Sequence, residues 1–242
     1  MPYRQRQTRR TLSAVLLLLA AALGAAACDD DDPASPGPGA AQLRFVNAAP
    51  GAGAVTVKWD NSDAFTAVGY GSSAAAYKTV DAGVRSVKVR AAAATTDLAT
   101  GDVTAKRDEP YTVLLVKEGT AHSVVALADT NTAPAAGKAR LRIAHAAPAA
   151  NGSVDVYVTA PGADLAAATP SAAGVQLKKA SKYLDVDAGD RQLRLTAAGA
   201  KTVLLDAGTL SLTSGQVRTV VALEADAGGT PLKAVVLQDR NP

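Results

Sequence analysis

The stretch Leu43-Arg44-Phe45-Val46-Asn47-Ala48-Ala49-Pro50 decides the fold, because it recurs as Leu141-Arg142-Ile143-Ala144-His145-Ala146-Ala147-Pro148. Further matches follow in the same order: 77–83 with 183–189, 111–114 with 218–221, and a closing aspartate at Asp129 and Asp239. The second copy carries about seven extra residues within 159–182. A period near 100 residues indicates two tandem domains, since solenoid units are about 20–50 residues long.

The pattern inside each copy predicts β-strands. Val55, Val57 and Trp59 alternate with polar residues, which places the three apolar side chains on one face. The continuous apolar run 114–116 suits a central strand covered on both faces or a strand end, and the Asp81-Ala82-Gly83 turn connects two strands. The expected fold is all-β, with two tandem antiparallel immunoglobulin-like β-sandwiches of about seven strands each. We expect them at 42–131 and 138–242, joined by a short linker over 130–137.

These motifs resemble the bacterial family called domain of unknown function 4397. The resemblance rests on the Leu-Arg-x-x-x-Ala-x-Pro starts at 43–50 and 141–148, the strand 154–158 and the two Tyr-x-x-Val-Asp-Ala-Gly turns. It covers nearly all of 42–239, and the first copy departs from it at Asn47 and Thr56. It implies exported lipoproteins with tandem β-domains and brings no assigned activity.

The N-terminus predicts an export signal over 1–27. Four arginines precede an apolar segment from Leu12 to Leu23, and small residues at 25–27 lead directly to Cys28. The order Ala-Ala-Ala-Cys resembles a lipobox, in which cleavage between Ala27 and Cys28 accompanies acylation of the sulfur. Ordinary signal peptidase cleavage remains the alternative, because Ala25 stands where that family usually has leucine. A transmembrane anchor is disfavoured, since about 16 apolar residues fall short of the ~20 that span a bilayer.

Residues 28–41 are predicted to form a solvated tether, because Asp29–Asp32 and three prolines follow the cysteine without any apolar period. The expected location is therefore the bacterial cell envelope, with the protein held on the inner or outer membrane through acyl chains on Cys28. The sequence leaves open the membrane, the leaflet and the choice between the general and twin-arginine export routes.

Composition excludes several function classes. Four of the 25 basic residues lie in the signal peptide, so the mature chain has 21 basic against 22 acidic residues, without the basic patch that nucleic-acid binding requires. The single cysteine excludes a disulfide framework, and no cofactor motif is present. With two histidines and no nucleophile elbow, we expect no enzyme; a hydrolase would need His145 or His122 beside a nucleophile. The acidic run 185–190 could suggest calcium, but its pattern favours a turn.

The weak contact candidates are Tyr157, Asp155 and His145. Alternation predicts that Tyr157 faces away from the core beside Asp155, whereas His145 and its counterpart Asn47 are interpreted mainly as partners of nearby backbone. Residues 159–182 form the most open region, with a small cluster of lysines. Beyond turns and strand ends we expect no polar constellation common to both copies.

The leading hypothesis is a non-enzymatic envelope lipoprotein acting as a structural or interaction module for envelope proteins or surface polymers. The alternative is a carbohydrate or small-ligand binder, which the aromatic content of 4% disfavours.

Overall fold

A computed structural model describes residues 39–73, 76–130 and 132–240. The predicted signal peptide, Cys28 and most of the predicted tether lie outside these residues. In the part of the chain that is described, no helix is long and apolar enough to cross a membrane. The first repeat consists of strands β1 (Ala40–Ala48), β2 (Val55–Trp59), β3 (Ser62–Val68), β4 (Lys78–Asp81), β5 (Gly83–Ala91), β6 (Asp97–Ala105), β7 (Pro110–Glu118) and β8 (Ala121–Ala128).

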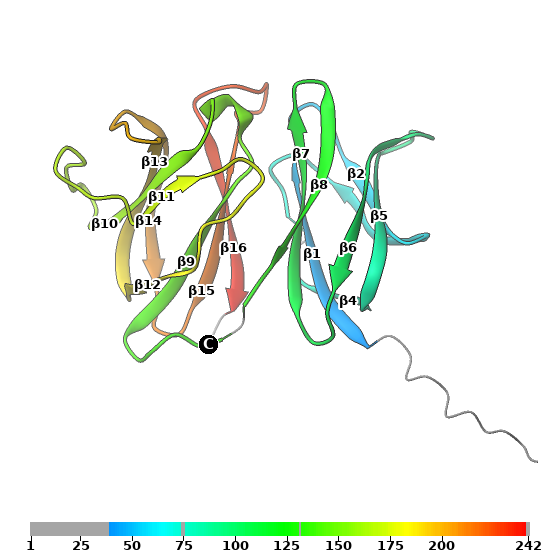
Figure 1. Cartoon of the computed structure of the whole chain (residues 1–242), viewed down its shortest axis with the longest axis horizontal. Helices are drawn as coiled ribbons and strands as arrows, with labels where there is room; N and C mark the ends of the chain where they lie inside the picture. Colours follow the sequence, from blue (N-terminus) through cyan, green and yellow to red (C-terminus); the bar gives the residue numbers. More distant parts are fainter. Residues whose placement is uncertain (1–38, 74–75, 131, 241–242) are drawn as a thin grey trace, which may run out of the picture. The chain divides into compact units, whose positions relative to one another are not determined.

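The second repeat has the same strand order (Figure 1). A short 3-10 helix, η1 (Pro148–Ala150), follows its first strand. Its strands are β9 (Lys138–His145), β10 (Val154–Thr159), β11 (Ala172–Val175), β12 (Leu184–Asp187), β13 (Gly189–Ala197), β14 (Val203–Leu212), β15 (Val217–Leu223) and β16 (Lys233–Arg240).

Over the described residues, each repeat is a sandwich of two four-stranded sheets. The sheets are β4-β1-β7-β8 with β3-β2-β5-β6, and β12-β9-β15-β16 with β11-β10-β13-β14. The predicted tandem β-sandwiches are therefore confirmed, with eight described strands per repeat instead of about seven. The first and seventh strands of each repeat pair in parallel, 42–48 with 110–116 and 140–145 with 217–222. The parallel pair arises because the chain crosses to the other sheet between these strands, and parallel pairing needs such a long crossover.

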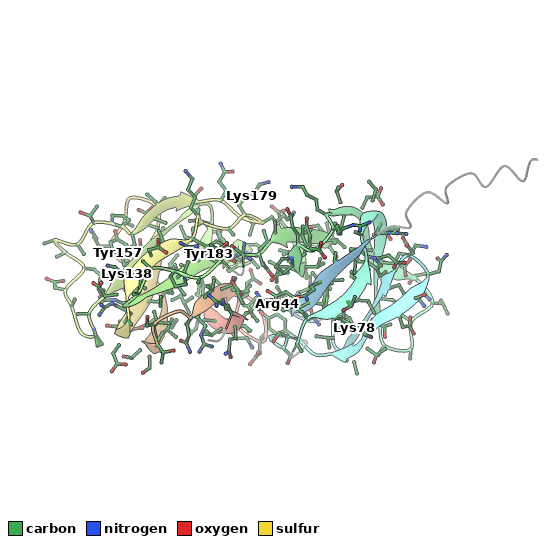
Figure 2. The ribbon with its side chains drawn as sticks, turned by 90° about the horizontal axis from the view of Figure 1, so that it is seen from below. Arg44, Lys78, Lys138, Tyr157, Lys179 and Tyr183 are labelled. Atoms are coloured by element: carbon green, nitrogen blue, oxygen red, sulfur yellow. The ribbon has the colours of Figure 1, made fainter. Side chains whose placement is uncertain are left out.

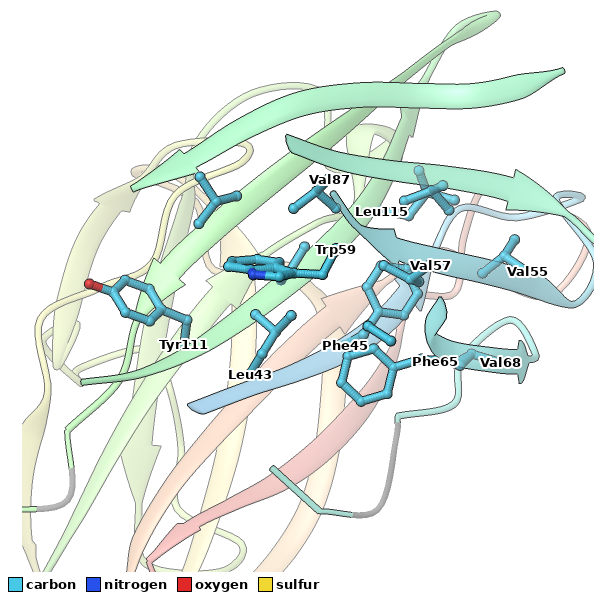
Figure 3. Close-up of a cluster of buried hydrophobic side chains, with 14 of the residues drawn as sticks. Leu43, Phe45, Val55, Val57, Trp59, Phe65, Val68, Val87, Tyr111 and Leu115 are labelled. Carbon is cyan, nitrogen blue, oxygen red and sulfur yellow. The ribbon is translucent and has the colours of Figure 1, made fainter. Parts of the chain in front are cut away.

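The core of each sandwich follows the alternation in the sequence. Val55 and Val57 are fully buried and Trp59 is 6% exposed, all three in one apolar cluster with Phe45 and Val87 (Figure 3). The inward position predicted for Trp59 is thus confirmed. A matching cluster in the second repeat is built around Ile143, Val156, Leu193 and Leu195. Full burial of each such side chain contributes about 1.5–3 kcal/mol relative to leaving it exposed.

The continuous apolar runs have a second buried face, where the repeats pack on each other. In β7, Val113 and Leu115 point into the core of the first sandwich, whereas Leu114 and Val116 belong to a separate apolar cluster. The other members of that cluster come from both repeats: Val46, Ala48, Ala144, Ala146, Val221, Leu223 and Leu237. The sheets β4-β1-β7-β8 and β12-β9-β15-β16 therefore contact each other through their outer faces.

Candidate functional site

A buried polar constellation lies between the repeats, where Arg44 on β1 reaches into the second repeat. Its Nε donates to Thr112 Oγ1 at 2.8 Å, and its Nη1 donates to the carbonyl oxygen of Gln238 at 3.1 Å. Its Nη2 pairs with the carboxylate of Asp239 and lies 3.4 Å from Oδ2 of Asp129. One guanidinium therefore joins a neighbour in its own repeat to two carboxylates, one from each repeat.

Arg142 on β9 makes the same contacts in the opposite direction. Its Nε donates to Thr219 Oγ1 at 2.9 Å, its Nη1 donates to the carbonyl oxygen of Ala128 at 2.7 Å, and its Nη2 pairs with Asp129. Because each repeat offers the same groups to the other, the contact is isologous, like the interface of a two-fold homodimer.

Threonine and tyrosine hydroxyls hold each aspartate from within its own repeat. Thr112 and Thr219 donate to Asp129 and Asp239 at 2.6 Å, whereas Tyr77 and Tyr183 donate to them at 2.6 and 2.8 Å. Each guanidinium also lies over the tyrosine ring of its own repeat, at 4.7 and 4.6 Å from the ring centroid. We call this set the inter-repeat network (Figure 2 labels Arg44 and Tyr183): Arg44, Tyr77, Thr112, Asp129, Arg142, Tyr183, Thr219 and Asp239.

The network is nearly dry, so its charges depend on one another. The Asp129 and Asp239 side chains are 0% exposed, and those of Arg44 and Arg142 are 4% and 5% exposed. Burial raises the pKa of Asp129, an effect that Arg142 and Arg44 oppose. Burial lowers the pKa of Arg44, but the nearby negative charges of Asp239 and Asp129 raise it by more, so the pKa of Arg44 is higher than its ordinary value. Removing one member of such a buried pair leaves an uncompensated charge.

Two polar contacts join the repeats near the other end of the parallel strands. The Tyr70 hydroxyl of the first repeat donates to the Glu224 carbonyl oxygen of the second at 2.8 Å. Lys178 of the second repeat pairs with Glu118 of the first at 2.7 Å. With the apolar cluster between them, these contacts and the inter-repeat network hold both ends of the interface.

The expectation of no shared polar constellation was therefore wrong. All four kinds of network residue occupy matched positions of the sequence repeat, in the Leu-Arg starts, the Tyr-x-x-Val-Asp-Ala-Gly turns, the Thr112 and Thr219 strands and the closing aspartates. The matched arginines and aspartates were therefore visible in the sequence repeat. A search for ion pairs within one repeat could not find them, because each arginine pairs most closely with the aspartate of the other repeat.

The prediction that Tyr157 is a surface contact is also wrong, since this residue is 1% exposed. The loop 160–170, within the segment that is longer in the second repeat, folds back toward this face. Arg194, opposite Tyr157 in the sheet, donates to the Ala163 carbonyl oxygen at 2.6 Å. Lys201 lies 4.8 Å from the Tyr157 ring centroid and donates to the Ala168 carbonyl oxygen at 2.5 Å. The loop and Lys201 thus cover the outer face of the sheet around Tyr157, which the alternating pattern of the strand predicted to be exposed.

Asp155 and His145 are buried and bound to backbone. The two carboxylate oxygens of Asp155 accept hydrogen bonds from the Gly174 and Gly199 N–H groups, each at 2.8 Å. His145 Nδ1 accepts the Ala147 N–H at 3.3 Å, and its Nε2 lies 2.9 Å from the Gly152 carbonyl oxygen. A neutral ring with hydrogen on Nε2 satisfies both contacts. Asp155 is therefore corrected from a contact to a structural residue, whereas the backbone role interpreted for His145 agrees with its contacts.

The remaining titratable candidates lie beside basic residues of neighbouring strands. His122 lies opposite Lys117 in the β7–β8 hairpin. In the acidic run 185–190, Asp185 pairs with Arg140 at 2.7 Å and Asp187 pairs with Lys138 at 2.6 Å. Those cations lower the pKa of both carboxyls, chiefly through the hydrogen bonds. Within the described residues, no group of three or more His, Cys, Asp or Glu side chains could hold a metal ion.

Two open clefts lie at the β3/β4 and β11/β12 edges of the sandwiches. The first edge cleft, of about 530 Å³, has polar lining from Thr66, Ser72, Ser73, Tyr77 and Lys78. The second edge cleft, of about 440 Å³, has polar lining from Ser171, Gln176, Lys179, Ser181 and Lys182. The second cleft falls in the open region indicated by the sequence.

The two clefts occupy equivalent places, as the backbone hydrogen bonds establish. In the first repeat the Asn47 N–H donates to the Ser72 carbonyl oxygen at 3.2 Å, and in the second the His145 N–H donates to that of Lys179 at 2.9 Å. Each cleft also has a left-handed residue in its edge segment, Ala67 with φ +56° and Gly174 with φ +65°. The same hollow therefore recurs in both repeats, although its side chains differ.

Comparison with protein families gives one match, to the Domain of unknown function (DUF4397), over residues 41–157 and 151–242. The chain belongs to the DUF4397 family. The resemblance predicted from the sequence is thereby confirmed, and the match spans both repeats of this DUF4397 protein. No curated protein matches the chain.

Several solved structures show a distant likeness to the chain, and two of them serve as examples. A family 26 carbohydrate-binding module from Eubacterium rectale, in complex with maltoheptaose, is 12% identical, covers 84% of this chain and 98% of its own, and has a TM-score of 0.30. A proposed adhesin from Bacteroides ovatus is 10% identical, covers 84% and 96%, and has a TM-score of 0.25. Likeness at this level does not transfer a function.

Proposed function

We propose that this DUF4397 protein is a non-enzymatic lipoprotein of the bacterial cell envelope. In this proposal acyl chains on Cys28 anchor it, and the two sandwiches act as one rigid structural and interaction module. Its partners are envelope components, either proteins or surface polymers.

One observation carries the proposal. Four pairs of polar residues that recur in both repeats form the buried contact between the repeats, and none of the eight network side chains is more than partly exposed. A duplicated domain that kept a reactive site would keep matched polar groups around a cavity instead. The matched polar residues of this protein instead join the two repeats, which favours a structural or interaction role over catalysis.

The strand directions give this module two distinct ends. The predicted tether continues into β1 at Ala40, and the parallel pairs bring the segments that follow β1, β7, β9 and β15 together at the opposite end. Pro50, Gly119, Pro148 and Gly228 of those segments line one shared cleft of about 360 Å³. A chain anchored through Cys28 would therefore present loops of both repeats at the end remote from its tether.

The anchor is tested by measuring the intact mass of the protein extracted from membranes. We expect a chain that begins at Cys28 and carries the added mass of acyl groups, and we expect Cys28→Ser to lose both the added mass and membrane retention. An unmodified mature chain, or one that begins elsewhere, would contradict the anchor.

The rigid module is tested by cutting the linker after folding. A specific protease site placed within 132–136 allows the full chain to be cleaved once both sandwiches have formed. We expect the halves to elute together in gel filtration, because the inter-repeat network and the apolar cluster persist without the covalent link. Halves that separate at micromolar concentration would refute a rigid module.

A further inference from the structure

We infer that the two edge clefts are matched sites for an acidic polysaccharide, that is, a polymer of sugars carrying carboxylates. This inference rests on the proposed envelope function and names a partner for it. It is carried by three features that both clefts share: their lining groups, the shape of their edge strands and their equivalent places in one rigid body.

The lining groups favour an anionic, hydroxyl-rich ligand. Lys179 and Lys182 of the second edge cleft are exposed, and no ion pair within the described residues occupies them. Their neighbour Lys178 is instead engaged by Glu118. Serine hydroxyls and the Gln176 amide supply donors and acceptors beside the lysines. No Asp or Glu stands among the described lining residues, and the Asp155 carboxylate behind Gly174 is buried and accepts backbone N–H groups.

The first edge cleft offers the same chemistry from other positions. Lys78 Nζ donates to the Ala64 carbonyl oxygen at 2.6 Å, which holds the ammonium group between the edges of the two sheets. An ammonium group has three donors, so this bond leaves two. Thr66, Ser72 and Ser73 contribute hydroxyls, and the described lining again contains no carboxylate. Each cleft thus has at least one lysine among its described lining residues, one in the first and two in the second, and Lys78 also borders a neighbouring pocket lined by three aspartates.

The edge strands disfavour an extended peptide as the ligand. Strand addition needs a straight edge with free N–H and C=O groups. The left-handed residues Ala67 and Gly174 interrupt the edge segments, and the pairing register shifts between Val55 and Val57 and between Val154 and Val156. Such irregularities block edge-to-edge pairing. A left-handed alanine is also strained, and strain of this kind clusters at ligand sites.

The placement of the clefts favours a repeating polymer. The isologous contact puts them on opposite sides of the body, as the positions of Lys78 and Lys179 indicate (Figure 2). A ligand made of identical units can fill both clefts, so one protein can join two polymer strands. The described lining of the second cleft includes no aromatic ring, whereas Phe65 and Tyr77 line the first, so in the second cleft charge and hydroxyl contacts rather than stacking would select the sugar.

The experiment measures binding of the full mature chain, held in detergent micelles, to immobilised polygalacturonate. The test variant is Lys179→Ala/Lys182→Ala, and the control is Lys88→Ala/Lys106→Ala, which removes the same charge outside both clefts. Exposed ion pairs are worth about 0.2–1 kcal/mol each, so we expect the test variant to bind about 2- to 30-fold more weakly. We expect the control to stay within twofold and all circular dichroism spectra to coincide.

Three outcomes would overturn the inference: no binding by the unmodified chain, an equal loss in the control, or equal binding of neutral dextran. Polyglutamate or polyphosphate bound as tightly as polygalacturonate would also overturn it, because the clefts would then respond to charge alone. None of these results bears on the mass of the acylated chain or on the linker cut. Failure here is therefore distinguishable from failure of the proposed function.

Discussion

Replacing Arg44 with methionine removes the charge of a side chain that is 4% exposed and keeps most of its apolar volume. The carboxylates of Asp239 and Asp129 are then left with one guanidinium, that of Arg142, in a site without access to water. Breaking a buried ion pair from one side costs about 3–5 kcal/mol, because the remaining charge is desolvated and uncompensated. That is a large part of the ~5–15 kcal/mol by which a domain is stable.

The loss is measured by urea unfolding of the full mature chain. Trp59 is the only tryptophan and lies in the core of the first repeat, so its fluorescence reports that repeat, whereas far-ultraviolet circular dichroism reports both. The control is Arg85→Met, because Arg85 makes a more exposed pair with Asp60 at 3.1 Å. We expect the control to cost at most about 1 kcal/mol. If both variants lose the same stability, the inter-repeat network does not behave as a buried ion pair.

The pH dependence of Arg44→Met gives a second check. Burial already raises the pKa of Asp129, and Arg44 is one of the two cations that oppose this rise. Without Arg44 the folded-state pKa rises further above the unfolded value of about 3.9. A folded state that binds protons more tightly gains stability as the pH falls toward that unfolded value. The penalty of Arg44→Met should therefore shrink as the pH falls through the raised folded-state pKa toward the unfolded value, and a penalty that grows with acidity would refute the reasoning.

The other predictions concern buried residues of the second repeat. His145→Asn should cost less than about 1 kcal/mol at pH 8 in urea unfolding, because Asn47 makes equivalent backbone bonds in the first repeat. Burial lowers the pKa of His145, so its stabilising effect is present above about pH 6.5 and is lost as the pH falls through the folded value. His145→Asn should remove that acid-side loss, and an unchanged pH profile would contradict this account. Leu165→Ala should cost about 2–5 kcal/mol and increase nitration of Tyr157, since Leu165 is the 5% exposed anchor of the covering loop. Unchanged nitration would mean that the loop does not protect the ring.

Sequence patterns predicted the parts of this protein that depend on neighbours along the chain. The repeat starting at Leu43 and Leu141 indicated the tandem domains, and alternation placed Val55, Val57 and Trp59 in a core. Alternation failed at Tyr157, because it describes one strand and cannot register a loop that returns over it. The sequence indicated the region of the second edge cleft, but it could not predict the matching pair of clefts, since each forms between strands from different sheets.

The sequence by itself therefore determined the repeat, the strand faces and the family. Its continuous apolar run at 114–116 also suited a strand covered on both faces, with a strand end as the alternative, because a strand with one solvated face alternates. Only the tertiary structure decided that this cover is the other repeat, and that Arg44 pairs with Asp239 while Arg142 pairs with Asp129. The physical reason is the distance along the chain over which each effect acts. The local backbone sets the periodicity of a strand, whereas a buried charge pairs with whatever group lies near it in space, and Asp239 is 195 residues from Arg44 along the chain.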